Sequence, residues 1–228
     1  MPEAEFDRHA ATYHRLHAEN VALSGEEPAY FAQYKVAYLK QLLRGETVNR
    51  ILDFGAGTGA STPYFTRFFP SSQIHCLDVS EKSLDLAREK HGASAQYQLF
   101  DGCKIPYGDD HFDVVFTACV FHHVERDRHR ETLKELWRVT KRQGRFFLFE
   151  HNPWNPLTVH AVNTCPFDEN AELIAAPAMR RRVRQAGFAA PHIAYCVFFP
   201  KALAWLRPLE KYLSWLPLGA QYLVHARK

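Results

Sequence analysis

Hydrophobic residues gather in five short runs between residues 51 and 150, separated by more polar segments. After the first, second and fourth runs, apolar residues recur every three or four positions, as in amphipathic helices. Short apolar runs that alternate with such helices predict a parallel sheet with right-handed crossovers. The predicted strands cover residues 51–54, 73–78, 95–102, 112–117 and 144–150, and helices are expected from Thr62, from Ser80 to about Lys90, and over 128–141.

Two helices are predicted before the first strand. Residues 3–20 carry Phe6, Tyr13 and His17 at near-helical spacing, and an aromatic stripe runs from Pro28 towards Gly45. Helices in this position often cover the cleft of an α/β fold, so residues 1–47 are expected to form a lid. The alternative for most of the aromatic stripe is packing against the sheet.

After residue 150 the pattern changes. Residues 151–176 are rich in Asn, Pro and aromatic residues and have little helical periodicity, which is typical of a functional loop insertion on the substrate side. A basic helix over 177–186 and two strands over 192–199 and 221–227 are expected to follow. A second insertion, residues 200–219, contains Trp205, Trp215, several leucines and a few cations.

The second insertion has two interpretations. Its tryptophans, leucines and cations suit a membrane surface or a greasy substrate. Alternatively it forms a helix that packs on the sheet or on a second copy of the chain. Pro208 should bend or interrupt the element in either case.

A glycine-rich turn follows the first predicted strand. Asp53 precedes Gly55, Gly57 and Gly59, and a helix with Pro63 in its first turn begins directly afterwards. Glycine lets the backbone approach a ligand closely, and a helix N-terminus presents unpaired N–H groups. The Gly-x-Gly-x-Gly spacing differs from the Gly-x-Gly-x-x-Gly of dinucleotide-binding turns. Because the acid would repel a diphosphate but hold an amino group, the turn predicts a nucleotide-like ligand without phosphate.

Two further predicted strands end in aspartates. Asp78 follows Asp53 at about the distance at which a doubly wound fold places the carboxylate that binds ribose hydroxyls. Asp101 is suited to accept from the exocyclic amine of an adenine. The carboxyl ends of parallel strands share one edge, so all three carboxylates are expected on a common rim. The alternative for Asp78 is a solvated loop residue.

Composition narrows the class of protein. The 228 residues are 46% hydrophobic and 23% charged, as in an ordinary globular domain, and the net charge of +3 is too small and too dispersed to indicate nucleic acid. Five scattered cysteines without a Cys-x-x-Cys pair suit a reducing compartment. The N-terminus is acidic without an apolar core, and no apolar run approaches the roughly 20 residues of a membrane span. A single cytoplasmic domain over 1–228 is predicted.

The motifs resemble those of class I S-adenosylmethionine-dependent methyltransferases over roughly residues 48–150. Besides the glycine turn and the acidic strand ends, the resemblance rests on Phe112-Asp113-Val114-Val115 and on a hydrophobic turn with His122-His123-Val124. It implies a doubly wound, mostly parallel seven-stranded sheet (Rossmann-like) with an antiparallel C-terminal strand. Phe54 and Ala56 stand where relatives often have other small or apolar residues.

The same resemblance implies S-adenosylmethionine as cofactor. The glycine turn with Asp53 would hold the methionine end, Asp78 the ribose, and Asp101 with Gly102 the adenine, while the Cys119 carbonyl would lie under the methionine moiety. The complete set of expected cofactor-binding residues is Asp53, Gly55, Ala56, Gly57, Gly59, Asp78, Val79, Asp101, Gly102 and Cys119.

Methyl transfer needs a base only when the acceptor must lose a proton. His122, His123 and His151 are the candidate catalytic residues, because neutral imidazole is available near pH 7. Each of them can equally be a packed or hydrogen-bonded cavity residue. Glu150, at the end of the fifth strand, could orient a histidine or bind the acceptor. No metal site is expected, because adjacent histidines point in different directions on any regular backbone.

The predicted reaction is methyl transfer to a small-molecule acceptor, which could be apolar or glycolipid-like. Two alternatives remain open at this point: an NAD-dependent oxidoreductase, in which Asp78 would hold the NAD ribose, and a non-catalytic cofactor-binding or membrane-surface protein. Peripheral membrane contact and a homodimer also remain open.

Overall fold

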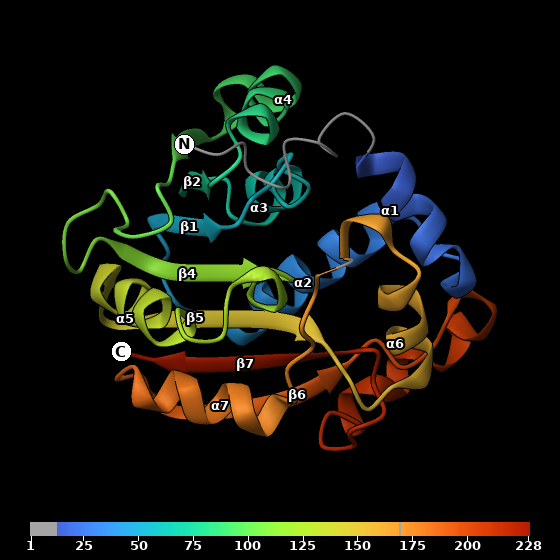
Figure 1. Ribbon diagram of the computed structural model, residues 1–228. Helices are drawn as coiled ribbons and strands as arrows, with labels where there is room; N and C mark the ends of the chain where they lie inside the picture. Colours follow the sequence, from blue (N-terminus) through green and yellow to red (C-terminus); the bar gives the residue numbers. More distant parts are fainter. Residues whose placement is uncertain (1–12, 169) are drawn as a thin grey trace.

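The computed structural model describes residues 13–168 and 170–228 and contains a seven-stranded sheet in the order β3-β2-β1-β4-β5-β7-β6 (Figure 1). The five strands from β3 to β5 are mutually parallel, and β7 runs antiparallel to both of its neighbours. The strands are β1 (Arg50–Phe54), β2 (Gln73–Asp78), β3 (Gln96–Leu99), β4 (Phe112–Ala118), β5 (Thr140–His151), β6 (Ala189–Cys196) and β7 (Gln221–Arg227). The predicted fold class is confirmed.

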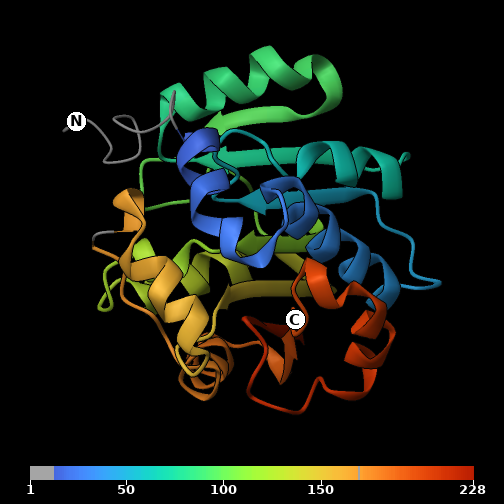
Figure 2. The same cartoon turned by 90° about the vertical axis from the view of Figure 1, so that its right-hand side faces the viewer.

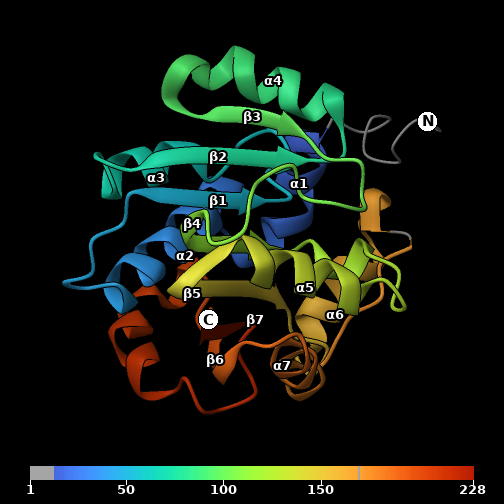
Figure 3. The same ribbon diagram turned by 90° about the vertical axis from the view of Figure 1, so that its left-hand side faces the viewer.

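Helices cover both faces of the sheet, which explains why its central strands are apolar on both sides (Figure 3). On one face, α2 (Pro28–Leu42), α3 (Thr62–Phe68) and α4 (Glu81–His91) share a buried cluster with β1, β2, β4 and β5. On the other face, α5 (His129–Val139) and α7 (Ala176–Gln185) share a second cluster with the same sheet. Phe116 and Val115, adjacent on β4, point into one cluster each.

Most of the predicted elements are present, with small shifts in their bounds. β2 and β7 have the predicted bounds, β3 is shorter, and β5 begins earlier, directly after α5. Ser80 is the N-cap of α4, as predicted, and its hydroxyl accepts from the Ser83 N–H. Ser61 is the N-cap position of α3, but its side chain accepts no bond from that helix.

The segments before β1 are helical. α1 spans Tyr13–Val21, and α2 contacts α1 and α3. The predicted helix over 3–20 is confirmed only from residue 13, since residues 3–12 lie outside the described residues. Tyr38 of α2 packs against Phe149 of β5, whereas Tyr30 and Phe31 line a cavity, so the aromatic stripe both packs on the sheet and covers the cleft.

The insertion after β5 differs from its prediction. It contains a regular helix, α6 (Pro156–Asn163), and a 3₁₀ turn at Pro166–Asp168. Asn155 caps α6 by accepting from the Thr158 N–H, and Pro156 occupies the first helical turn. The expectation of an irregular loop was therefore wrong, because the Asn-Pro start signal outweighs the weak periodicity.

Residues 201–212 form a 3₁₀ helix that lies largely on the surface. Pro208 lies within it, and the backbone kinks at Leu203. Trp205 and Trp215 are 75% and 73% exposed, so these two side chains do not pack on the sheet, although Glu210 of the same segment is buried. Figure 2 looks onto the carboxyl ends of the parallel strands, where α1, α6 and this segment gather. Within the described residues, no helix has both the length and the apolar character of a membrane span.

Candidate active site

A cavity of about 620 Å³ opens at the carboxyl ends of β1, β2 and β4. Its floor is the glycine turn after β1, and its walls come from α1, α2, the turn after β4, α6 and residues 197–200. The volume lies within the usual range for small-molecule sites. Crevices outside the carboxyl ends of strands are the general ligand site of open α/β sheets.

The glycine turn is shaped by two requirements. The Gly55 N–H donates to the Leu77 carbonyl, and a Cβ at Gly55 would lie 2.3 Å from Val120 Cγ2, so only glycine fits. At Gly57, where φ is +53°, a Cβ would meet no atom within 4 Å, which leaves open space above the backbone. This open cradle has the shape that a cofactor lying across the turn requires.

Asp78 is held beside the turn. Its Oδ2 accepts from the Gly57 N–H at 2.7 Å, and its Oδ1 accepts from the Ser80 N–H at 2.9 Å. A carboxylate oxygen can accept two hydrogen bonds, and the residue lines the cavity. Both oxygens are therefore positioned to accept from a pair of vicinal hydroxyls such as those of a ribose.

Asp53 and Lys35 bring opposite charges to the same wall of the cavity. Asp53 is 3% exposed, and burial together with the neighbouring Asp78 raises the pKa of its carboxyl to about 7, although Lys35 acts in the opposite direction. Lys35 Nζ lies 3.4 Å from Cys119 Sγ. An ammonium and a carboxylate side by side suit a ligand with an amino acid end.

The other predicted cofactor residues divide into two groups. Ala56, Val79, Gly102 and Cys119 line the cavity together with Asp53, Gly55, Gly57 and Asp78. Asp101 and Gly59 are not part of the lining. The exposed Asp101 carboxylate accepts from the Cys103 and Lys104 N–H groups, and a Cβ at Gly59 would clash with His91.

These contacts bear on two of the predicted roles. Gly59 permits close packing of the turn against α4, and the adenine role of Asp101 stays a prediction.

Glu150 organises the turn after β4. Its Oε1 accepts from the Val120 and Phe121 N–H groups, and its Oε2 lies 2.6 Å from His122 Nδ1. The carboxylate is fully buried, so it fixes both the backbone of the 3₁₀ turn Phe121–His123 and the orientation of the His122 ring. Burial alone would lower the pKa of His122, but Glu150 and then Asp168 outweigh burial and raise that pKa.

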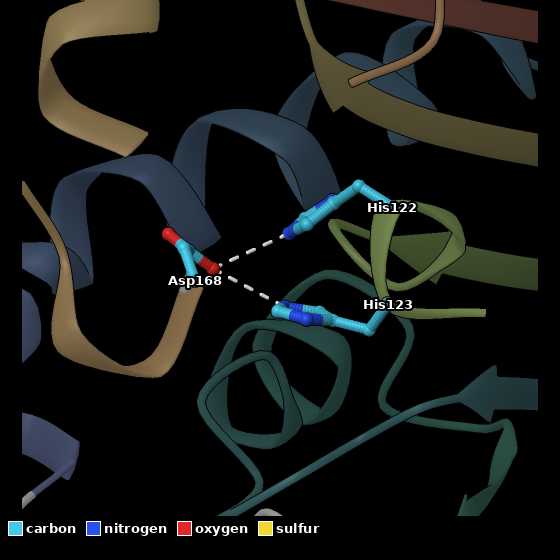
Figure 4. Close-up of side chains that lie close together, drawn as sticks. All are labelled: His122, His123 and Asp168. Atoms are coloured by element: carbon cyan, nitrogen blue, oxygen red, sulfur yellow. Dashed lines mark ion pairs between the residues drawn. The ribbon is translucent and has the colours of Figure 1, made fainter. Parts of the chain in front are cut away.

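The two adjacent histidines lie side by side. The His122 and His123 ring centroids are 4.1 Å apart, and both rings face Asp168 (Figure 4). The expectation that adjacent imidazoles diverge was wrong, because the 3₁₀ turn lacks the alternation of a strand. His151, at the end of β5, completes the group, with its ring centroid 5.0 Å from that of His122. The three candidate catalytic histidines thus line one cavity.

Sequence reasoning missed two residues of the site. Lys35 lies on the same helical face as Ala32, Val36 and Leu39, and a lone lysine on a buried face was the available signal. Asp168 reaches the histidines from the 3₁₀ turn after α6. No local pattern around Asp168 indicates this, because its position depends on the path of the whole insertion.

Comparisons with known proteins agree with this geometry. Residues 52–148 match the family model described as a methyltransferase domain. A ubiquinone/menaquinone biosynthesis C-methyltransferase of Ectopseudomonas mendocina is 32% identical over 127 residues, which are 52% of this chain and 48% of that protein. A demethylmenaquinone methyltransferase of Deinococcus radiodurans is 35% identical over 107 residues, covering 46% and 44%. The chain thus spans about half the length of these curated relatives.

Solved structures share the fold. A methyltransferase of Thermotoga maritima, described as a possible histamine N-methyltransferase, superposes with a TM-score of 0.68 at 19% identity and covers 98% of both chains. One from Archaeoglobus fulgidus has a TM-score of 0.65 at 15% identity and covers 85% of this chain and 94% of that one. Residues 52–148, which contain the glycine cradle, Asp53 and Asp78, therefore match a methyltransferase domain, and the chain has the fold of S-adenosylmethionine-dependent methyltransferases.

Proposed function

We propose that the chain transfers a methyl group to a small apolar molecule with an oxygen-bearing ring. The observation that carries this is the lining of the cavity, which combines a polar cofactor cradle with apolar side chains. The glycine turn, Asp53 and Asp78 supply the polar cradle. The same lining includes the three histidines and the apolar side chains of Phe31, Val120, Leu157, Val162, Phe198 and Phe199.

The names of the relatives agree with such an acceptor. They are methyltransferases of ubiquinone and menaquinone biosynthesis, and the first is described as a C-methyltransferase. By analogy, we propose a quinol-type ring methylated at carbon. The match to a methyltransferase domain and the similarity to methyltransferases of quinone biosynthesis favour methyl transfer over the NAD-dependent oxidoreductase. A cytoplasmic location stays a prediction of the sequence.

The side chains of the protein need to fill only a few roles in this reaction. S-adenosylmethionine carries the methyl group on a sulfonium. When the methyl group passes to the acceptor, the rest of the cofactor leaves as a neutral thioether. The protein aligns the acceptor, excludes water and takes up a proton if the acceptor is a hydroxyl or a phenol-like ring. Glu150 and Asp168 engage His122, and Asp168 also faces His123. Among the described residues no carboxylate lies within ion-pair distance of His151, so we assign the proton to His151.

Two measurements test the proposed function. Calorimetry with S-adenosylmethionine should show one binding site, and incubation with a demethylated quinol should add the mass of one methyl group. The His151→Gln variant should keep cofactor affinity and lose most of the turnover. Methylation of polar amines but not of quinols would contradict the acceptor class, and cofactor binding would still stand.

Alanine at Gly55 and alanine at Gly57 should have different consequences. Both positions have positive φ, which costs about 1–2 kcal/mol for an alanine. Gly55→Ala adds a clash with Val120 and should lower the free energy of unfolding further, whereas Gly57→Ala adds no clash but intrudes on the cofactor cradle. Urea unfolding and calorimetry separate the two effects. Equal losses of stability, with cofactor affinity unchanged in Gly57→Ala, would contradict this account of the turn.

We also propose that the exposed surface around residues 201–218 contacts a membrane. Leu209, Tyr212 and Leu218 are exposed beside Trp205 and Trp215, and Lys201 and Lys211 supply positive charge. The neighbouring residues 197–200 line the cavity, so an apolar acceptor could enter from the lipid.

Replacing Trp205 and Trp215 with serine should weaken binding to vesicles that contain anionic lipid by about tenfold per tryptophan, because each buries an apolar ring. Leu99→Ser, an exposed apolar change on β3 at the opposite sheet edge, is the control and should have no effect. Co-sedimentation measures the binding. If the double variant binds vesicles as the wild type does, the membrane proposal is wrong. If light scattering shows a dimer for the wild type and a monomer for the double variant, the surface belongs to a homodimer interface.

A further inference from the structure

Three side chains direct their donor atoms to one point beside the cavity (Figure 4). Asp168 Oδ1 lies 3.2 Å from His123 Nε2 and 3.5 Å from His122 Nε2, and the three atoms are all within 4.8 Å of one another. His122 and Asp168 are buried, with side chains 1% and 3% exposed, and His123 is nearly so. The chain brings them together from two segments, the turn after β4 and the turn after α6.

Glu150 determines which nitrogen of His122 faces Asp168. The contact of 2.6 Å to a buried carboxylate places a proton on Nδ1, which leaves the Nε2 lone pair directed at the oxygen of a second carboxylate. Two electron-rich atoms that face each other in a buried site require a cation between them. A proton on His122 Nε2 would satisfy the contact between His122 and Asp168. It would not change the contact between His123 and Asp168.

The Asp168 oxygen supplies a second, independent observation. Within the described residues, Oδ1 is buried and accepts no hydrogen bond of regular geometry, although two ring nitrogens approach it. Buried carboxylate oxygens are rarely left in this state. Two ring nitrogens that approach a buried carboxylate oxygen without a regular hydrogen bond are candidates for ligands of a common ion.

The two distances from Asp168 to the histidines match the edge of a tetrahedral metal site. Zinc binds histidine nitrogen and carboxylate oxygen at about 2.0–2.2 Å, so neighbouring ligands of a tetrahedral ion are about 3.3–3.5 Å apart. The two contacts to Asp168, 3.2 Å and 3.5 Å, lie at this edge length. Glu150 then takes the position of the carboxylate that commonly fixes a ligating histidine from behind.

Charge favours a divalent ion over a proton. With both imidazoles neutral, Glu150 and Asp168 bring two negative charges into the buried cluster. One proton cancels one of these charges, whereas a divalent ion cancels both. Burial of uncompensated charge is costly, so full neutralisation is the more stable state.

We propose that His122, His123 and Asp168 bind one divalent transition-metal ion, with zinc the best fit, and that Glu150 orients His122 through its other ring nitrogen. Two histidines and one carboxylate are a common ligand set for such ions. Because all three residues line the cavity, a fourth position faces the ligand space. If the proposed methyl transfer is right, this position is available to an oxygen of the acceptor.

Cobalt titration tests the site directly. The full-length chain is treated with a chelator, dialysed and titrated with Co²⁺, whose visible absorption reports four-coordinate binding, and zinc should then displace it. The expected result is one ion per chain. His123→Gln and Asp168→Ala should each abolish the absorption, and Glu150→Gln should weaken binding by about 10–100-fold.

Two controls keep the test decisive. His160→Gln removes an exposed imidazole outside the cavity and should bind Co²⁺ like the wild type. Calorimetry with S-adenosylmethionine shows that each variant is folded. Wild-type protein that takes up less than one ion per chain, or ligand variants that bind cobalt as the wild type does, would overturn the proposal. Cofactor binding without metal binding would leave the methyltransferase function standing.

Discussion

Replacing Asp78 with asparagine should weaken the binding of S-adenosylmethionine by about 1–3 kcal/mol, or roughly 5–150-fold in the dissociation constant. Both carboxylate oxygens accept from backbone N–H groups, of Gly57 and Ser80. An amide puts an N–H₂ group where one of these donors points, so the N–H of either Gly57 or Ser80 loses its acceptor. It also offers fewer acceptors to the ribose hydroxyls.

Calorimetry on wild type and variant measures this loss. Asp85→Asn is the matched control, since Asp85 is an exposed residue of α4 that pairs with Arg88 and does not line the cavity. It should leave the dissociation constant unchanged. If a folded Asp78→Asn protein binds the cofactor as tightly as the wild type does, the ribose role of Asp78 is wrong.

Without cofactor, the free energy of unfolding of the wild type should fall between pH 5 and pH 8. Replacing Asp53 with asparagine should remove this fall. The pKa of the Asp53 carboxyl is raised from 3.8 to about 7, mainly by burial and then by Asp78. The folded state therefore holds a proton that the unfolded state has lost, and stability falls as the pH rises from about 4 to 7. Between pH 5 and pH 8, the Asp53 carboxyl therefore lowers the free energy of unfolding by about 2.5 kcal/mol. The asparagine variant has no such group and should not show this change.

Urea unfolding at the two pH values measures this difference between wild type and variant. The same substitution should weaken cofactor binding at pH 8, where the ionised carboxylate would hold the ammonium group of the ligand. Cofactor affinity of the wild type should rise between pH 6 and pH 8, and that of the variant should not. Parallel pH profiles for the two proteins would contradict the raised pKa.

The cofactor half of the site could be predicted from the sequence because short-range rules determine it. Apolar runs fix the strands, and parallel strands must deliver Asp53 and Asp78 to the same edge. The Gly-x-Gly-x-Gly spacing marks the turn directly, although the contact that excludes a side chain at Gly55, with Val120, is tertiary. Asp101 follows its strand too, but its carboxylate turned to the N–H groups of its own loop, a local competition that the pattern does not reveal.

The acceptor half could not be predicted in the same way. Asp168 meets His122 across more than forty positions of sequence, and its approach depends on α6 and the turns on either side of it. The direction of His123 followed from a 3₁₀ turn held by Glu150, whose acceptor bonds are tertiary. Tertiary contacts thus determine the positions of Asp168 and His123, which local periodicity could not predict.

The order of the last strands constrains how the sheet is completed during synthesis. β6 emerges before β7, yet β7 is its hydrogen-bonding partner and separates it from β5. Until residues 221–227 are made, β6 has no docking site in the sheet and β5 keeps an open edge with buried aromatic residues such as Phe147 and Phe149. The nascent chain therefore passes through a stage with an incomplete sheet and an unpaired, aggregation-prone strand edge. During this stage a chaperone or rapid translation would protect it from self-association.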